Sequence, residues 1–312
     1  MSWSAADIPD QHGRTAVVTG ANGGLGLETA RQLAAKGAHV VMAVRNQEKA
    51  EAALQDIRSS APEASLELVT LDLASQASVR AAAEQIIAAH KRIDLLINNA
   101  GVMGIPEAKT ADGFEMQFGV DHLGHWSLTA LVLPALLRTP GARIVTGTST
   151  AHHMGRALNP ANPHLHGRYR PWRAYGQAKL ANFHFGLGLQ RELQQAGART
   201  ASLIAHPGLS NTDLQAVSVQ ETGGGASQRF FLFLARHTGM SPAEGALSQL
   251  RAATDPAAKG GEFYGPRFVN NGPPVRKPIM RRLDMDKAIA ALWEVSERET
   301  GIAIDVRAAA AA

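Results

Sequence analysis

Short apolar runs alternate with longer amphipathic segments through the first half of the chain. The first run, Thr15-Ala16-Val17-Val18-Thr19, is rich in β-branched residues and stops at a glycine, as a buried parallel strand does. Similar runs predict strands at 39–44, 66–71 and 93–97, with helices ending near residue 36 and spanning 46–58 and 75–90. This alternation with short links predicts a parallel sheet with helices on both faces.

The second half continues the pattern less regularly. Strands are predicted at 143–148, 200–205 and 261–264, the last of these as the final strand, and helices at 241–253 and 287–299. In the closing helix we expect Leu292, Trp293 and Val295 to be buried. The alanine run at 308–312 is interpreted as a frayed tail outside the fold. Because no repeat or long linker interrupts the pattern, we predict one α/β domain over 1–312 with a doubly wound parallel sheet, a Rossmann fold.

Composition narrows the class of protein. The chain has 312 residues, a formal charge of +4 and a pI near 9.6, but its Lys and Arg residues are spread out, which favours a solvated basic face over a nucleic-acid site. With no cysteine, disulfides and thiolate metal sites are excluded. No apolar run is long enough for a bilayer and the N-terminus lacks a secretory pattern, so we expect a cytoplasmic protein without a transmembrane segment. The assembly state, monomer or homo-oligomer, stays open.

A glycine-rich segment between the first strand and the first helix is the first chemical signal. Its spacing is Gly20-x-x-x-Gly24-x-Gly26. A strand that leads through glycines into a helix presents free backbone N–H groups and the positive end of the helix dipole to a pyrophosphate. The alternative is a tight turn that binds nothing. The flanking strand and helix favour a dinucleotide cofactor.

The end of the second strand bears on which cofactor binds. NAD-selective folds usually place a carboxylate there for the ribose 2′-hydroxyl. Here the sequence is Val44-Arg45, and a guanidinium can clamp a 2′-phosphate. We therefore expect NADP(H) rather than NAD(H), the alternative being that Arg45 is only a solvated charge.

A tyrosine and a lysine follow at helical spacing. Tyr175 and Lys179 share one helical face, where an ammonium lowers the pKa of a phenol and makes it useful for proton transfer. Ser149 follows the strand predicted at 143–148, at the edge of the sheet where ligands bind in such folds. A tyrosine and a lysine at this spacing can occur by chance in any helix. The pair becomes evidence for catalysis only together with the nucleotide-binding pattern upstream.

These motifs occur in one order that resembles a known family. With Thr19–Gly26, Asp72-Leu73, Asn98–Gly101 and Tyr175–Lys179, the chain resembles the short-chain dehydrogenase/reductase family over residues 13–215. Segments 41–46, 113–117, 122–126, 151–153 and 179–182 are most similar to soluble, bacterial-type, retinol dehydrogenase-like members. Membrane-bound relatives carry an N-terminal apolar anchor, whereas this sequence starts directly with the fold. The resemblance implies cofactor contacts from Gly20, Asn22, Gly24, Leu25, Gly26, Arg45, Asp72, Leu73, Asn99, Ala100, Gly101, Tyr175, Lys179, Pro207, Gly208 and Thr212.

The resemblance also implies catalytic roles. Ser149 would hydrogen-bond the substrate oxygen, Tyr175 would exchange a proton with it, and Lys179 would bind the nicotinamide ribose and depress the tyrosine pKa. The family places an asparagine at a helix distortion in the fourth catalytic position, and this chain has Asp121 there. An aspartate keeps the shape and an acceptor but loses the amide donor. It either sustains the proton relay behind Lys179 or traps the lysine.

Two less regular regions are expected to shape the substrate site. The segment 216–260 includes the apolar run Phe230–Leu234 and is predicted as a helical lid, with 283–300 as the closing helix region. A lid of this character suggests a lipophilic aldehyde, ketone or alcohol as substrate. The histidines between Ser149 and Tyr175 lack metal-binding spacing, so no metal is expected there, although His152 and Trp172 are candidates for the substrate mouth. The leading prediction is an NADP(H)-dependent oxidoreductase. The alternative is an NADP(H)-binding sensor or scaffold with weak or no turnover because of Asp121.

Overall fold

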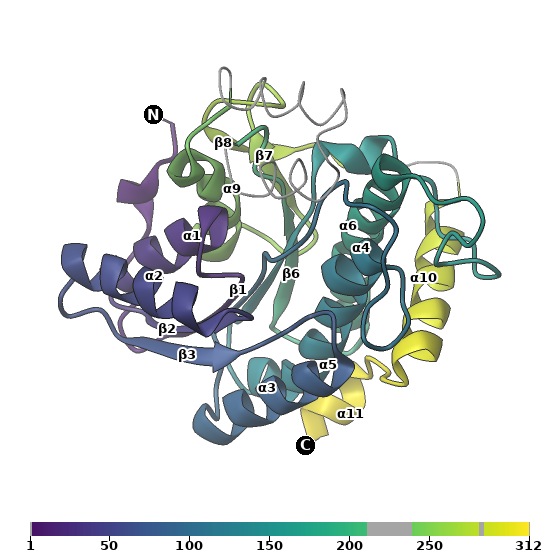
Figure 1. Cartoon of the computed structure of the whole chain (residues 1–312). Helices are drawn as coiled ribbons and strands as arrows, with labels where there is room; N and C mark the ends of the chain where they lie inside the picture. The colour runs from purple at the N-terminus through teal and green to yellow at the C-terminus, as the bar shows by residue number, and fades with distance from the viewer. Residues whose placement is uncertain (1, 211–238, 281–283, 312) are drawn as a thin grey trace.

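The computed structural model describes residues 2–210, 239–280 and 284–311. Its centre is an eight-stranded sheet with the order β3-β2-β1-β4-β5-β6-β7-β8 (Figure 1). Neighbouring strands are parallel except for β7 and β8, which are antiparallel. The strands are β1 Thr15–Thr19, β2 His39–Val44, β3 Leu66–Thr70, β4 Leu95–Asn98, β5 Arg143–Gly147, β6 Ala201–Ala205, β7 Phe263–Pro266 and β8 Pro274–Lys277.

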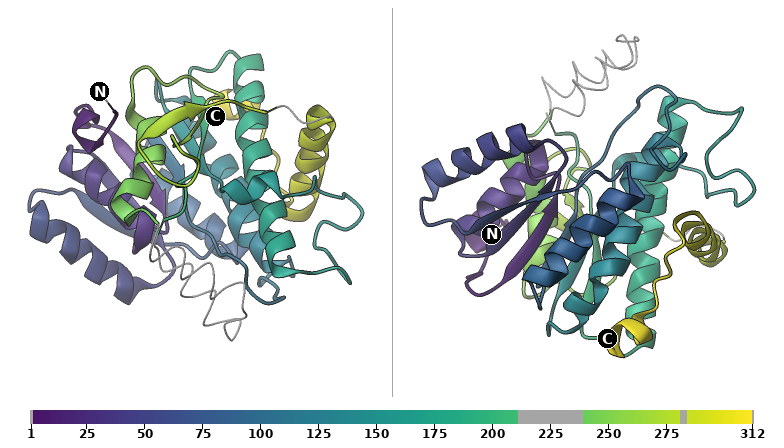
Figure 2. Two further views of the ribbon diagram at one scale, coloured as in Figure 1. Left: turned by 90° about the horizontal axis from the view of Figure 1, so that it is seen from above. Right: turned by 60° about the horizontal axis from the view of Figure 1, so that its bottom comes forward.

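Helices cover both faces of this sheet. Helices α1, α2 and α9 lie on one face and α3, α5 and α6 on the other, as Figures 1 and 2 show. The helices are α1 Gly24–Ala35, α2 Gln47–Ser60, α3 Gln76–Ala89, α4 Met116–Phe118, α5 Gly124–Leu137, α6 Pro171–Gln195, α9 Pro242–Thr254, α10 Met285–Thr300 and α11 Val306–Ala311. Shorter turns are the 3-10 helices η1 Ala5–Asp7 and η3 Thr150–His153 and the π-helical turn η2 Gly119–Leu123.

Alternation along the central strands explains the two layers. Successive strand residues point to opposite faces, so Val17 and Leu96 pack under α3 and α5 whereas Val18 and Ile97 pack under α1 and α9. All four side chains are fully buried. The doubly wound α/β fold predicted from the sequence is therefore confirmed.

The strand order determines where a ligand can bind. The connection from β1 leads to α1 on one face, and the chain after β4 leads to α5 on the other face. A crevice forms outside the carboxyl ends of two such strands, and the motifs singled out in the sequence follow these ends.

The predicted strands differ from the observed ones in the bounds of β4 and at the edge formed by β7 and β8. β2 lies at the predicted residues, but β4 starts at Leu95 rather than at residue 93 and continues to Asn98. The prediction that 261–264 is the last strand is wrong, because β7 runs over Phe263–Pro266 and β8 follows it. β8 begins at Pro274, which an edge strand tolerates because one side of it needs no ladder hydrogen bonds.

Ala308–Ala311 belong to the fold, so the interpretation of these residues as a frayed tail is wrong. They lie in α11, which packs against α5, and Val306 at its start is buried. Ala312 lies outside the described residues. The preceding segment is fixed by a hydrogen bond that Trp126 Nε1 donates to the carbonyl of Ile302 at 2.8 Å. In α10, Leu292 and Val295 are buried as predicted, but Trp293 is only half-buried.

Of the predicted lid, residues 216–238 lie outside the described residues. The following helix, α9, packs against α1 and against β6 and β7, so this part of the range covers the sheet. Among the helices that the structure describes, none combines the length and apolar character needed to cross a membrane.

Candidate active site

The glycine loop is shaped by two glycines that no other residue could replace without strain. Gly20 has a φ of +68°, and its N–H donates to the carbonyl of Ala43 at 2.9 Å. A Cβ on Gly26 would lie 2.2 Å from the carbonyl oxygen of Gly20 and 2.6 Å from Asn99 Nδ2. The start of α1 can therefore lie against β1 and β4 only because Gly26 has no side chain.

The N-terminus of α1 differs from those of its neighbours. Side chains cap α2, α3 and α9, since Asn46, Ser75 and Ser241 each accept a backbone N–H bond. The N-cap of α1 is Gly23, and within the described part of the chain no side chain caps it. The first N–H groups of α1 are thus available to an anion, which fits the pyrophosphate of a dinucleotide.

A groove with a cavity of about 390 Å³ runs along this helix terminus and the ends of β1 to β4. Its lining includes eleven of the residues that the sequence predicted as cofactor contacts. They are Gly20, Asn22, Gly24, Leu25, Gly26, Arg45, Asp72, Leu73, Asn99, Ala100 and Gly101.

Two cations lie at the outer end of the groove. Arg45 follows β2 as predicted and is exposed, and Lys49, one turn further along, also lines the groove. The Asn46 side chain accepts the N–H of Lys49 at 2.8 Å and so fixes the first turn of α2 beside them. Asp72 lies further in, where its Oδ1 accepts the N–H of Ala74 at 3.0 Å.

A second cavity of about 280 Å³ holds the catalytic candidates. Ser149, Tyr175 and Lys179 all line it, together with Pro207 and Gly208 from the loop after β6. The two cavities share Leu25, Asn99, Gly101 and Val102 in their walls, so the groove opens onto this pocket. Thr212 lies outside the described residues, and its role stays a prediction.

Hydrogen bonds to the end of β5 hold α6 in register. Thr148 Oγ1 donates to the carbonyl of Lys179 at 2.7 Å, and Asn182 Nδ2 donates to the carbonyl of Gly147 at 2.9 Å. These two bonds place the Tyr175 face of α6 opposite Ser149. The hydroxyl of Thr148 is thus used in the scaffold, whereas Ser149, the N-cap of η3, faces the pocket.

The environment of Tyr175 only partly matches the predicted one. Burial raises the pKa of the Tyr175 phenol above its ordinary value, and the Asp121 carboxylate adds to the increase. The Lys179 ammonium, 5.4 Å from the ring centroid, acts in the predicted direction and lowers this pKa, as does a hydrogen bond with Ser149. The net pKa of the Tyr175 phenol is nevertheless raised in the protein alone, because desolvation outweighs the charge of Lys179.

Asp121 lies directly behind Lys179. Its Oδ2 is 2.9 Å from Lys179 Nζ, and its Oδ1 accepts the N–H of Val102 at 2.7 Å. Burial raises the pKa of Asp121, and the ammonium of Lys179 opposes this increase. Burial would lower the pKa of Lys179, but Asp121, through its charge and a hydrogen bond, and Tyr175 together outweigh this effect and raise it. The pair is best described as a buried ion pair.

The helix around Asp121 has the distortion expected from the resemblance. Gly119–Leu123 forms a π-helical turn between α4 and α5. The Asp121 carbonyl accepts from His125 Nδ1 at 3.0 Å, and His125 Nε2 lies 2.9 Å from Thr19 Oγ1. Because burial lowers the pKa of His125 to about 4, its ring is neutral at neutral pH, with the proton on Nδ1. The π turn is therefore connected by hydrogen bonds to the end of β1.

Asn99 connects the two halves of the sheet at the same place. Its N–H and Nδ2 donate to Thr19 Oγ1 and to the Thr19 carbonyl at 2.9 and 2.8 Å. Its Oδ1 accepts from Gln249 Nε2 of α9 at 3.1 Å. Asn99 thus stabilises the loop that both cavities share.

Sequence reasoning missed several lining residues. Lys49 could have been found from the sequence, since it lies one helical turn after Arg45. No motif or spacing in the sequence points to the other missed residues, which are Met103, Leu209, Gln249 and Asn270. Trp172 lines the catalytic pocket as expected, together with Met154. His152 does not, because its ring is buried and stacks on Phe183 with centroids 4.6 Å apart.

Comparisons with known proteins agree with this fold. A family model described as short chain dehydrogenase matches residues 14–223. Human retinol dehydrogenase 13 is 44% identical over 212 residues, which are 68% of this chain but 62% of that protein, less than two thirds of its length. Mouse polyprenol dehydrogenase is 40% identical over 270 residues, covering 85% of this chain and 77% of that one. A crystal structure from Mycobacterium paratuberculosis matches with a TM-score of 0.79 and 41% identity, covering 97% of this chain and 99% of the other.

The fold is therefore that of a Rossmann-type α/β protein, with a groove suited to a dinucleotide along the carboxyl ends of its strands. The chain belongs to the short chain dehydrogenase family, and within it the chain is similar to retinol dehydrogenases. The family predicted from the motifs is confirmed.

Proposed function

We propose that this protein is an NADP(H)-dependent oxidoreductase that interconverts a lipophilic aldehyde or ketone and the corresponding alcohol. The observation that carries this proposal is the continuity of the two cavities. Ser149, Tyr175 and Lys179 line one cavity, the glycine loop lines the other, and the two share a wall. A nicotinamide cofactor bound in the groove supplies or accepts the hydride.

The roles of the side chains follow from their chemistry and burial. Ser149 donates a hydrogen bond to the substrate oxygen and orients it beside the phenol of Tyr175. Tyr175 protonates that oxygen during reduction and accepts its proton during oxidation. Lys179 places a positive charge near the ring, at 5.4 Å, and favours the phenolate needed for oxidation. Thr148 and Asn182 act as positioning residues, because they hold α6 on β5.

The preference for NADP(H) is supported by charge at the end of β2. Arg45 and Lys49 line the groove where a ribose 2′-phosphate would lie, and Asp72, at the end of β3, is the one carboxylate among its described lining residues. A guanidinium and an ammonium favour a phosphate over a hydroxyl. Asp72, which follows the neighbouring strand β3, would contact the adenine end of the cofactor.

The lipophilic character of the substrate is supported by the walls of the catalytic pocket. Within the described part of the chain, Lys179 is the one charged residue in its lining. Apolar side chains make up much of the rest, among them Val102, Met103, Met154, Trp172 and Leu209. Such walls gain free energy by covering apolar substrate surface and discriminate weakly between apolar substrates of similar size.

The second candidate function is an NADP(H)-binding sensor or scaffold with little turnover. It is favoured by one observation, the ion pair between Lys179 and Asp121. This ion pair keeps the ammonium bound to the carboxylate, so that it does not exchange protons with a relay. Against it stands the retention of Ser149, Tyr175 and Lys179 in one pocket, which a protein that only binds the cofactor does not need.

The experiment is a screen of NADPH oxidation over lipophilic aldehydes, ketones and quinones. Tyr175→Phe is expected to lower kcat by about 10²- to 10⁴-fold, because it removes the group that transfers the proton. Its affinity for NADPH, measured by cofactor fluorescence, should stay close to wild type. Tyr264→Phe is the matched control, since Tyr264 of β7 donates a hydrogen bond to Glu262 and does not line the pocket. Tight NADPH binding without turnover of any compound would favour the sensor instead.

A further inference from the structure

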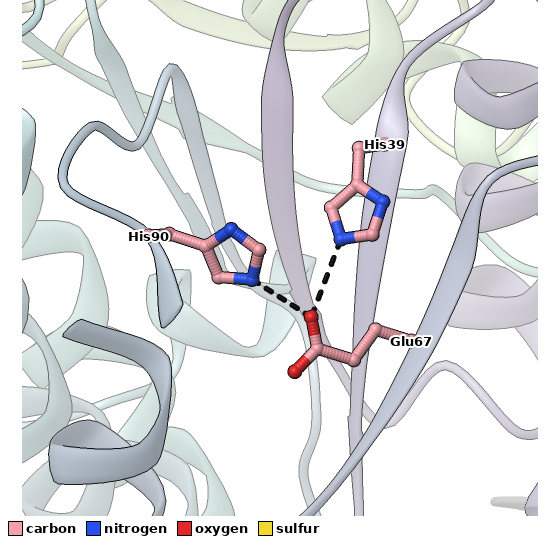
Figure 3. Close-up of side chains that lie close together, drawn as sticks. All are labelled: His39, Glu67 and His90. Carbon is pink, nitrogen blue, oxygen red and sulfur yellow. Dashed lines mark hydrogen bonds and ion pairs between the residues drawn. The ribbon is translucent and has the colours of Figure 1, made fainter. Parts of the chain in front are cut away.

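Two histidines and a glutamate meet at the edge of the sheet opposite to the proposed active site. His39 is the first residue of β2, Glu67 is the second residue of β3, and His90 is the C-cap of α3. Figure 3 shows the two imidazole rings and the carboxylate pointing toward one another. The catalytic candidates follow the carboxyl ends of the strands, whereas this cluster lies at their amino ends.

The distances within the cluster are close to those of a ligand set. Glu67 Oε2 lies 3.3 Å from His39 Nε2 and 2.7 Å from His90 Nε2. All three ligand atoms lie within 4.8 Å of one another. Around a tetrahedral ion with bonds of about 2.0–2.1 Å, neighbouring ligand atoms are about 3.3 Å apart. The His39–Glu67 distance already has this value, and a small movement of the Glu67 side chain opens the other.

A second contact orients His39 as metal-binding histidines are oriented. His39 Nδ1 is 2.7 Å from Ser65 Oγ. When Nδ1–H donates to this hydroxyl, the lone pair of Nε2 points at the Glu67 carboxylate. Two acceptors that face each other require a cation between them, either a proton or a metal ion. Because a serine hydroxyl can accept this proton, the contact with Ser65 is compatible with the tautomer that binds a metal ion.

The backbone holds the three ligands firmly. β2 and β3 are paired with Val41 opposite Glu67, so His39 and Glu67 project from the same face of the sheet, the face that α3 covers. The His90 N–H donates to the carbonyl of Ile86 at 2.8 Å and ends α3 at this point. The negative end of the α3 dipole therefore lies beside the cluster and favours a cation there.

The site is accessible and chemically selective. The side chains of His39, Glu67 and His90 are 30%, 27% and 15% exposed, so an ion can enter from solvent while the ligands stay ordered. Imidazole nitrogens select transition ions over Mg²⁺ and Ca²⁺, which prefer oxygen ligands only. Two imidazoles and one carboxylate leave a fourth position for water.

We propose that His39, Glu67 and His90 bind one zinc-type divalent ion, which joins the amino ends of β2 and β3 to the C-terminus of α3. The ion replaces the proton between imidazole and carboxylate and holds a sheet edge to its covering helix. The site is structural and independent of the proposed hydride transfer, because none of the three residues lines either cavity of the active site.

The test is titration of chelator-treated, tag-free protein with Zn²⁺ by calorimetry, and with Co²⁺ to detect the visible absorption of a tetrahedral site. Wild type should bind one equivalent, and at free zinc a hundredfold above Kd its thermal midpoint should rise by about 4 °C. His90→Gln and Glu67→Gln should each weaken binding by about a hundredfold or more while retaining NADPH binding, which reports folding.

The matched control is His12→Gln. His12 pairs with Asp10 at the surface, which is a histidine and a carboxylate without the third ligand. This variant should bind zinc as wild type does. The proposal is overturned if wild type binds no zinc, if the His90 and Glu67 variants bind it equally well, or if His12→Gln loses it to the same extent.

Discussion

Lys179 and Asp121 form an ion pair in the interior, with 2.9 Å between Nζ and Oδ2 and with side chains that are 9% and 0% exposed. The same carboxylate raises the pKa of Lys179 and, through space, contributes to the raised pKa of Tyr175. One residue thus acts on the protonation of both groups that face the substrate.

Replacing Asp121 by Asn should shift the pH dependence of the reaction. Without the negative charge the pKa of the Tyr175 phenol falls, so alcohol oxidation, which needs the phenolate, becomes active at lower pH. Carbonyl reduction, which needs the phenol, declines from a lower pH for the same reason. On the plateau, kcat should stay within about tenfold of wild type, because Ser149, Tyr175 and Lys179 remain. The measurement is kcat/KM against pH in both directions.

The control for this prediction is Asp286→Asn. Asp286 also forms an ion pair, with Arg191 at 2.7 Å, but it is exposed and lies on α10. Its profile should superimpose on that of wild type. If the Asp121→Asn profile superimposes as well, the carboxylate has no influence on the proton transfer.

Arg45 and Lys49 should determine the preference for NADPH. Arg45→Ala and Lys49→Ala are each expected to raise KM for NADPH about 10- to 100-fold, because each removes a charge-assisted contact to the 2′-phosphate. KM for NADH should change little. Steady-state kinetics with both cofactors provide the measurement, and Arg58→Ala, an exposed arginine on the last turn of α2, is the matched control. Equal increases in KM for NADPH and NADH would show that the two side chains do not recognise the 2′-phosphate.

The sequence was most informative where periodicity and a short motif coincide. The residues of β2 were predicted correctly because an apolar run is bounded by a glycine turn and by Arg45. Ser149, Tyr175 and Lys179 were brought together by strand and helix spacing, and the structure places them in one pocket.

What the sequence could not predict depends on packing between distant segments. The net pKa of Tyr175 is an example, because the effect of Lys179 follows from helical spacing, whereas burial, which dominates, follows from the whole fold. His39, Glu67 and His90 are also far apart in the chain, and only the register of β2 and β3 together with the end of α3 brings them together. β8 was missed because Pro274, its first residue, is unusual in a strand and hides the edge-strand pattern.

Gly26→Ala should weaken both the fold and cofactor binding. The new methyl group would meet the carbonyl oxygen of Gly20 at 2.2 Å and Asn99 Nδ2 at 2.6 Å, so α1 must move away from the strand ends. Overpacking of this kind costs about 1–3 kcal/mol of unfolding free energy. Because the N–H groups of α1 move with the helix, the Kd for NADPH should rise about tenfold or more.

The control for Gly26 is Gly141→Ala. Gly141 has a φ of +77° in a turn with open space around it, so an alanine there costs about 1 kcal/mol through backbone strain alone. Its Kd for NADPH should equal that of wild type. Urea denaturation and cofactor fluorescence measure the two quantities, and an unchanged Kd in Gly26→Ala would contradict the inference that this glycine positions the phosphate site.

Glu115 should make the stability of the protein fall as pH rises toward neutrality. Burial raises its pKa to about 7 although the N–H groups of Gln117 and Phe118 favour its carboxylate. A raised pKa means that the folded protein binds more protons than the unfolded chain between about pH 4.5 and 7, so unfolding free energy decreases across this window. The decrease should reach about 3 kcal/mol above pH 7.

In Glu115→Gln this contribution to the pH dependence should disappear, because the amide does not titrate. The variant also loses one of two acceptor oxygens, a cost that does not change with pH, so its curve of unfolding free energy should be flatter without being higher everywhere. Urea denaturation at pH 5 and pH 8 measures the difference, with Glu84→Gln, an exposed residue of α3, as control. If Glu115→Gln and wild type lose the same free energy between these pH values, the Glu115 carboxyl does not titrate in this window, and its contacts with Gln117 and Phe118 hold it ionised throughout.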